Sequence, residues 1–312
     1  MSPLETNLEF LRLSLPKTEK VEMEGFKILI DSGLKLIYDH STSKPNNPLE
    51  SDCAILFQMS LLKGLSLMEL VGGINYANSS DSKIKLINII DPFSVSTIVR
   101  GQFEAYCMFY NFLHQHTDQS QRDLLYNLWV IAGLNERQEF SYAAKSQLSK
   151  DKLIAERQRI TLLIMEVKNS TIYKSNGGKS AKKIDNAIKN KKYRYYFENG
   201  ELMDGYWGVL FKNSGVNNQS DLFKEIYPYL CSDTHPSQVS VFQFRDIFKK
   251  EEFRSRAMFG VIISKFIISF FIRDFCEYYP GAKTIFNGLP KLNQLLINVH
   301  NTTLRGNSYS IN

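Results

Sequence analysis

The segment from Pro92 to Gln115 constrains the fold of this chain more strongly than any other. It follows Asp91, and an acidic residue followed by proline is a typical start of an α-helix. Its apolar residues recur at helical spacing over more than half of the circumference, so the helix must be buried on most sides. These residues are Phe93, Val95, Ile98, Val99, Phe103, Tyr106, Phe109 and Leu113. We therefore expect a central helix with other helices packed around it.

A second apolar segment predicts another core helix at about residues 252–279. Its side chains are apolar nearly all round between Ala257 and Ile272, and Pro280-Gly281 ends the pattern. The chain has only 17 Gly and 9 Pro in 312 residues, which favours long helices over many strands and turns. The predicted fold class is mostly α: a multi-helix bundle with a lysine-rich insertion. For this insertion, helices alone and a mixture of helix and β-strand are both compatible with the sequence.

We expect a single helical domain over residues 1–312, because a chain of this length can bury one large core. Within it, residues 1–48 are expected to form peripheral helices and a loop, 168–206 a basic insertion, and 302–312 a flexible polar tail. A short helix is predicted around Ile84–Ile90. Asn199-Gly200 is a dipeptide typical of a β-hairpin turn.

The positive charge of the chain is concentrated in one segment. Residues 168–194 contain nine basic residues and one acidic residue, Asp185, whereas the whole chain has a net charge of +6. The rest of the chain is therefore slightly acidic. This distribution argues against a uniformly basic nucleic-acid-binding protein and favours a local basic arm at residues 168–194.

The basic arm predicts contact with RNA or another polyanion through residues 168–194. The candidate nucleic-acid-binding residues are Lys179, Lys182, Lys183, Lys189, Lys191, Lys192 and Arg194. The alternative is a solvated, flexible insertion without a ligand.

Arg100 and Glu104 are the first candidate site residues. They are four residues apart on the predicted central helix, so their side chains meet on one face. If this pair is buried, removing either partner should destabilise the fold by roughly 3–5 kcal/mol. The sequence allows two interpretations of these residues: a structural ion pair, or part of a functional polar cleft.

His235 is the third candidate. It precedes Pro236, so its backbone should be extended and it should lie at a helix end. Histidine is suited to proton transfer near neutral pH, and Ser232, Asp233 and Ser237 are close enough in sequence to orient its ring. The alternative is a capping or packing histidine.

The sequence predicts no cofactor and no metal site. The chain has five His and four Cys, with no Cys-x-x-Cys or His-Glu-x-x-His spacing. No secretory signal is recognisable at the N-terminus, and Lys265 interrupts the longest apolar run. We expect a cytoplasmic protein without a membrane partner, and a homo-oligomer is left open.

Two motifs together resemble a family of proteins. The first is Ser96, Arg100 and Glu104 on one helix, and the second is Trp207, Tyr227, Cys231 and His235-Pro236-Ser237. The pattern is similar to a bacterial all-helical family of unknown function that is distantly HEPN-like. The resemblance implies a nucleic-acid-directed protein, a ribonuclease or an effector of toxin or defence systems. The Arg and His that HEPN ribonucleases carry four to six residues apart on one helix are not found here at that spacing.

Two function hypotheses follow. In the first, the basic arm holds RNA and a polar centre of Arg100, Glu104 and His235 carries the catalysis. In the second, the chain is a non-enzymatic interaction or scaffold module, and the same three residues only stabilise the bundle. The sequence does not decide whether the chain is an enzyme.

Overall fold

The computed structural model describes residues 2–41, 47–81, 83–175, 178–216, 225–235, 237–249 and 252–311. These residues form 14 α-helices and two small two-stranded antiparallel sheets, which confirms the mostly-α fold class. The contacts divide the chain into two compact units. Unit 1 comprises Met1–Tyr110 with Ser214–Asn312, and unit 2 comprises Asn111–Asn213. The single domain stays a prediction.

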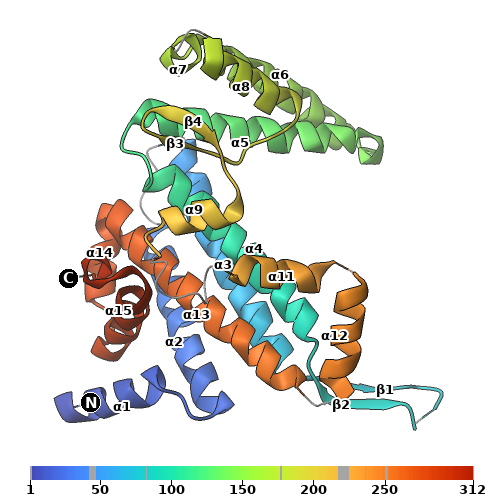
Figure 1. Cartoon of the computed structure of the whole chain (residues 1–312), viewed down its shortest axis with the longest axis vertical. Helices are drawn as coiled ribbons and strands as arrows, with labels where there is room; N and C mark the ends of the chain where they lie inside the picture. The colour runs from blue at the N-terminus through green and yellow to red at the C-terminus, as the bar shows by residue number, and fades with distance from the viewer. Residues whose placement is uncertain are drawn as a thin grey trace. The chain divides into compact units, whose positions relative to one another are not determined.

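Unit 1 holds most of the helices (Figure 1). Its elements are α1 (Pro3–Ser14), α2 (Glu19–His40), α3 (Pro48–Val71), β1 (Ile74–Ala77), β2 (Lys85–Ile89), most of α4 (Pro92–Leu113), α11 (Ile226–Thr234), α12 (Gln238–Lys249), α13 (Phe253–Tyr278), α14 (Pro280–Asn287), α15 (Lys291–Arg305) and the short 3-10 helix η3 (Asn307–Tyr309).

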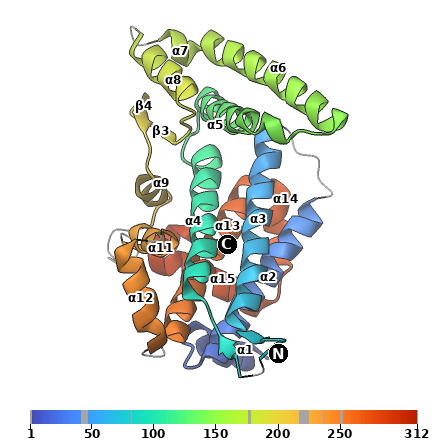
Figure 2. The ribbon, with the colours of Figure 1, turned by 90° about the vertical axis from the view of Figure 1, so that its right-hand side faces the viewer.

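The core of unit 1 is built around α13. This helix packs against α2, α3, α14 and α15, as Figures 1 and 2 show. Phe57 of α3 stacks on Phe271 of α13 with 5.2 Å between ring centroids. A Cβ atom on Gly260 would lie 2.4 Å from Cγ1 of Val95, so α13 and α4 approach closely at this glycine. The two predicted core helices thus form, and they pack against each other.

Local capping explains where two helices of unit 1 begin. The Asp91 carboxylate accepts a hydrogen bond from the backbone N–H of Phe93 at 3.0 Å, which confirms the predicted start of α4. The side chain of Asn47 accepts one from the N–H of Glu50 at 2.9 Å, so α3 begins at Pro48. Pro228 lies in the first turn of α11, where a helix needs no N–H donor.

The predicted short helix around Ile84–Ile90 is wrong. Residues Lys85–Ile89 form β2, which pairs with β1 in an antiparallel hairpin. Tyr76 lies opposite Leu86, and Asn88 adopts a positive φ of 53°. A short apolar run fits a helix or a strand equally well, and here pairing with the preceding segment decides between them.

Both ends of unit 1 contain buried helices. Phe26, Leu29 and Ile30 of α2 are buried and α2 packs on α13, so this helix belongs to the core and not to the periphery. Residues 302–305, assigned above to the flexible tail, belong to α15, and the Arg305 side chain is fully buried. Asn298 hydrogen-bonds the backbone N–H and C=O of Ile311.

Unit 2 contains the lysine-rich segment. Its elements are the end of α4, α5 (Gln119–Glu139), the 3-10 turn η1 (Ser141–Ala143), α6 (Gln147–Asn169), α7 (Thr171–Lys174), α8 (Lys179–Lys189), β3 (Tyr195–Glu198), β4 (Glu201–Asp204) and α9 (Trp207–Asn213). Asn199 and Gly200 both have positive φ, 51° and 79°, and join β3 to β4 as the hairpin dipeptide predicts.

By length and composition alone, α3 and α13 could each cross a membrane. In the structure, 72% of the most apolar window of α13 and 39% of that of α3 is buried inside the protein. The α13 burial is typical of the core helix of a soluble protein. The cytoplasmic location stays a prediction.

Candidate functional site

Arg100 and Glu104 form the predicted pair on α4. Arg100 Nε lies 2.9 Å from Glu104 Oε1. Their side chains are 26% and 29% exposed, so the pair is not buried. The loss of about 3–5 kcal/mol expected for a buried pair therefore does not apply to it. An ion pair with this access to water contributes far less than a buried one.

The same two side chains also bind α11. Arg100 Nη1 donates a hydrogen bond to Thr234 Oγ1 at 2.8 Å, and the Tyr227 hydroxyl donates one to Glu104 Oε1 at 2.8 Å. The Arg100 guanidinium lies 5.6 Å from the centre of the Tyr227 ring. Burial raises the pKa of Tyr227, and its hydrogen bond to the Glu104 carboxylate raises it further. These four side chains connect α4 to α11.

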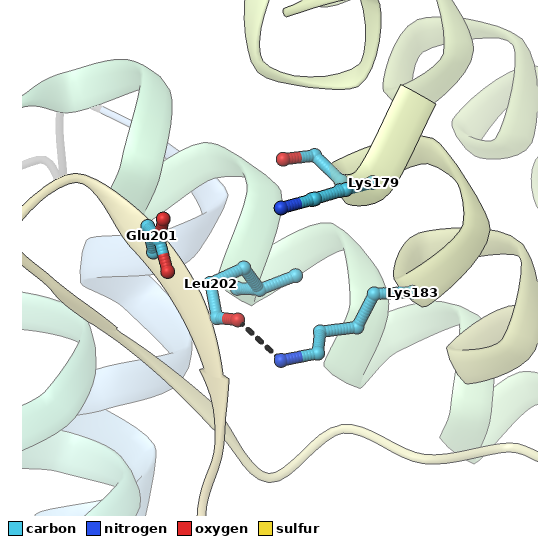
Figure 3. A pocket seen from close by; sticks show the side chains of 5 residues that line it. Lys179, Lys183, Glu201 and Leu202 are labelled. Carbon is cyan, nitrogen blue, oxygen red and sulfur yellow. Dashed lines mark hydrogen bonds between the residues drawn. The ribbon is translucent and has the colours of Figure 1, made fainter. Parts of the chain in front are cut away.

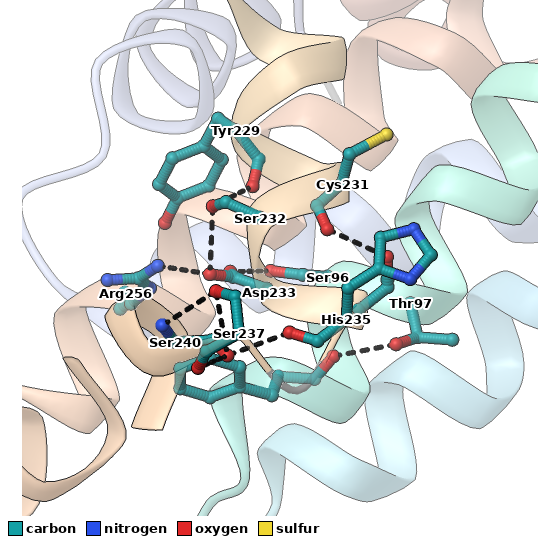
Figure 4. Close-up of polar contacts among 12 residues, drawn as sticks. Ser96, Thr97, Tyr229, Cys231, Ser232, Asp233, His235, Ser237, Ser240 and Arg256 are labelled. Carbon is teal, nitrogen blue, oxygen red and sulfur yellow. Dashed lines mark hydrogen bonds and ion pairs between the residues drawn. The ribbon is translucent and has the colours of Figure 1, made fainter. Parts of the chain in front are cut away.

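Asp233 is the centre of a network that the sequence does not predict (Figure 4). Its side chain is fully buried, and one carboxylate oxygen accepts a hydrogen bond from Ser96 Oγ at 2.6 Å. The other oxygen pairs with the guanidinium of Arg256. Arg256 lies between the rings of Phe93 and Tyr229, at 5.3 and 5.0 Å from their centroids. Asp233 thus joins α11 to both α4 and α13.

His235 is at the end of α11 with an extended backbone, φ −110° and ψ 133°, as predicted. Pro236 lies outside the described residues. The expected orientation of the ring by its neighbours is wrong. Asp233 is held by Ser96 and Arg256, Ser232 donates to the carbonyl of Tyr229, and Ser237 donates to Ser240. A buried carboxylate needs a charged partner, and Arg256 provides it.

The imidazole of His235 is exposed and points away from Asp233 (Figure 4). Within the described parts of the chain, it makes no hydrogen bond with Arg100 or Glu104. Arg100 hydrogen-bonds instead to Thr234, the residue before His235. The structure therefore brings Arg100 and Glu104 together and leaves the His235 ring outside their hydrogen bonds.

A surface cavity of about 320 Å³ adjoins this region. Its lining residues are Asp91, Phe93, Asp233, Thr234, His235, Ser240, Val241 and Phe244. Two aromatic side chains, Phe93 and Phe244, and several polar residues line this open depression. His235 is one of the lining residues, whereas Arg100 and Glu104 are not.

Two further ion pairs lie deeper in unit 1. Lys265 and Glu22 form an ion pair at 2.6 Å with side chains only 5% and 8% exposed. Arg305 and Asp274 pair at 3.1 Å with no exposed side-chain surface. The only sequence signal for the first pair is a lysine inside the most apolar helix.

The basic residues of unit 2 divide into two groups. Lys183 donates to the carbonyl of Leu202 at 2.6 Å, Lys191 pairs with Glu139, and the Arg194 guanidinium lies 5.3 Å from the centre of the Trp207 ring. These three side chains bind other parts of the protein. Part of the positive charge of residues 168–194 is therefore used in contacts within the chain.

The second group forms an exposed face of α8. Lys179, Lys182 and Lys189 recur at spacings of three and seven, with Asn186 between them, and all four are exposed. Lys192 is also exposed and lies just beyond the helix. None of these four lysines forms an ion pair with any residue that the structure describes. The opposite face of α8 is buried through Ser180, Ile184 and Ala187.

A cavity of about 490 Å³ lies beside the first turns of α8 (Figure 3). Lys179, Ser180 and Lys183 line it on the helix side, and Glu201 and Leu202 of β4 line it on the other. Within the described ranges, no group of three or more His, Cys, Asp or Glu side chains is arranged to hold a metal ion.

Comparison of the chain with protein-family models, with curated proteins and with solved structures gave no match. The resemblance to a HEPN-like helical family therefore stays a prediction, and so do the roles that it implies.

Proposed function

We propose that this chain binds RNA through the lysine face of α8, formed by Lys179, Lys182 and Lys189. The observation that carries the proposal is that these exposed lysines lie on one face and have no acidic partner in the described structure. The one acid of this helix, Asp185, pairs with Lys168 at 3.3 Å and accepts a hydrogen bond from Tyr173 at 3.0 Å. The face is therefore free to neutralise phosphates.

Lysines on a helix surface read charge and not bases, so the binding should tolerate different sequences. Single-stranded RNA is the favoured form, because aromatic side chains of the same unit can stack on unpaired bases. Tyr206, between β4 and α9, is 65% exposed. Lys183 holds α8 against β4, the strand that ends two residues before Tyr206.

The test is binding of a fluorescent single-stranded RNA, followed by anisotropy over a range of salt concentrations. The variant K179Q/K182Q/K189Q should bind more weakly, and the salt dependence of log K should fall by about two, since each single-strand phosphate contact contributes about 0.7. The control K17Q/K20Q/K85Q changes three exposed lysines of unit 1 and should bind like the wild type. Equal losses in both variants, or binding that salt does not weaken, would refute the proposal.

RNA cleavage is the second candidate function, in which Arg100, Glu104 and His235 act together. It is favoured by one observation: the Arg100 guanidinium binds Thr234, the residue next to His235, and His235 is exposed and is one of the residues that line a cavity. A histidine there could move a proton at the ribose 2′-hydroxyl, and the arginine could stabilise the phosphate.

Purified protein with a labelled RNA pool tests this second function, with H235A at matched folding as the comparison. Cleavage by the wild type that is lost in H235A would support it. If neither protein cleaves, Arg100, Glu104 and His235 are architectural, and the chain is an interaction module that acts by binding.

A further inference from the structure

The N-terminal helix α1 exposes a stripe of leucines. Leu4, Leu8, Leu11 and Leu15 are 70%, 59%, 54% and 72% exposed. The helix is nevertheless firmly placed, because Leu13 on its opposite side is buried and α1 packs on α2 and α15. Scattered surface leucines need no explanation, but three on one face of α1, followed by Leu15 at the residue that caps the helix, form an apolar patch without a cover in the described structure.

The spacing of these leucines is that of a coiled-coil seam. They are separated by four, three and four residues. Leu4, Leu8 and Leu11 therefore occupy successive d, a and d positions of a heptad, and Leu15, the C-cap residue, follows at the spacing of the next a position. Leu13 then occupies an f position, directly opposite the seam, in agreement with its burial against unit 1. A seam of this kind is complementary to another helix of the same pattern.

We infer that α1 pairs with α1 of a second copy of this chain. In an antiparallel pair related by a two-fold axis, Leu4 meets Leu15 of the second copy and Leu8 meets Leu11. The residues that flank the seam at e positions are Glu5 and Arg12, both exposed. The antiparallel pair places each Glu5 near an Arg12 of the other copy, which also pairs with Glu9 and Glu24 of its own chain, so opposite charges approach each other on both sides of the axis.

The charges of α1 disfavour a membrane surface as the cover. Helices that lie on membranes are rich in Lys and Arg on their polar face. The ionisable side chains of α1 are Glu5, Glu9 and Arg12, which give a net negative charge, and Arg12 already pairs with Glu9 and Glu24. Anionic lipid would be repelled by this face.

The pairing must be weak, because the seam is short. A helix of 12 residues is about 18 Å long, and interfaces well below about 1,200 Å² give transient complexes. The expected behaviour is an equilibrium between monomer and dimer that depends on protein concentration. This inference does not rest on RNA binding, because α1 lies in unit 1 and the lysine face in unit 2.

Sedimentation velocity of the full chain over about 1–200 µM tests the pairing, since weak associations titrate in this range. The wild type should shift from monomer towards dimer, and L8E/L11E should stay monomeric throughout. The control L62E/L148E replaces two other exposed leucines, at 53% and 81% exposure, and should dimerise like the wild type. A wild type that stays monomeric, or a dimer that L8E/L11E leaves intact, would overturn the inference.

Disulfide cross-linking tests the direction of the helices. Under mild oxidation L4C/L15C should form a covalent dimer, whereas L4C alone should not, because Leu4 faces Leu15 and not Leu4 in the antiparallel pair. Circular dichroism of each variant controls for helix content. Efficient cross-linking of L4C alone would indicate a parallel pair and contradict the antiparallel arrangement.

Discussion

The Ser96 hydroxyl of α4 donates a hydrogen bond of 2.6 Å to the Asp233 carboxylate of α11, and both residues are buried. Together with the Arg256 ion pair, this bond joins three helices that are distant in sequence. It lies directly beside the cavity that His235 lines. The position of the His235 backbone therefore depends on an acid that takes no part in the predicted polar centre.

Replacing Asp233 should destabilise unit 1 more than replacing Ser96. D233N leaves the Arg256 guanidinium without its counter-charge between two aromatic rings, and we expect a loss of about 3 kcal/mol. S96A removes one hydrogen bond and should cost about 1–2 kcal/mol. Urea denaturation followed by circular dichroism measures both values. Equal stability of D233N and the wild type would show that the Arg256 pair contributes nothing.

Replacing Arg100 should have a smaller effect than a buried pair would give. R100A removes the hydrogen bonds to Glu104 and Thr234, but both members of the ion pair are partly open to water. We expect a loss of about 1–2 kcal/mol in the free energy of unfolding, below the 3–5 kcal/mol for a buried pair. A loss above 3 kcal/mol in the same urea titration would contradict the observed exposure.

His300 should make the protein less stable in mild acid. Burial and, to a smaller extent, the nearby charge of Lys265 together lower the pKa of this histidine to about 3. In the unfolded chain it titrates near pH 6.5, so as the pH falls below this value the unfolded state binds a proton that the folded state does not. Its contribution to stability is complete above about pH 6.5 and is lost towards pH 3.

The expected size is about 1.4 kcal/mol per pH unit below pH 6.5, or about 2 kcal/mol between pH 7 and pH 5. Urea titrations at these two pH values measure it, with H300Q as the comparison. Between pH 7 and pH 5, the free energy of unfolding of H300Q should fall by about 2 kcal/mol less than that of the wild type. The same pH dependence in both proteins would show that His300 is not the titrating group.

Two glycine-to-alanine substitutions should have opposite effects. G260A would place a Cβ atom 2.4 Å from Val95, where α13 and α4 approach, and should cost about 1–3 kcal/mol. At Gly133 of α5 no atom lies within 4 Å of the added Cβ, so G133A should stabilise by up to about 1 kcal/mol through helix propensity. Thermal unfolding of the two variants measures the contrast, and destabilisation by G133A would be the unexpected result.

Local patterns alone determine a large part of this fold. The apolar periodicity of 92–115 and 252–279 predicts α4 and α13, because a helix that is apolar on most sides must be buried. Asp91-Pro92 sets the start of α4, and Asn199-Gly200 sets the β3–β4 turn. The spacing of Arg100 and Glu104 predicts their pairing, and Pro236 predicts the extended backbone of His235. Each of these features depends on residues within a few positions of one another.

Other features were decided only by the tertiary structure. Residues 85–89 form a strand because β1 pairs with them, although their own pattern also fits a helix. Asp233 contacts Ser96 and Arg256 and not the neighbouring His235, because a buried carboxylate takes the charged and hydroxyl partners that packing brings to it. The exposure of Arg100 and Glu104 likewise depends on how α11 covers α4. A sequence pattern carries the preference of each segment for a helix or a strand, but the neighbours across the core decide which side chains meet and which remain in water.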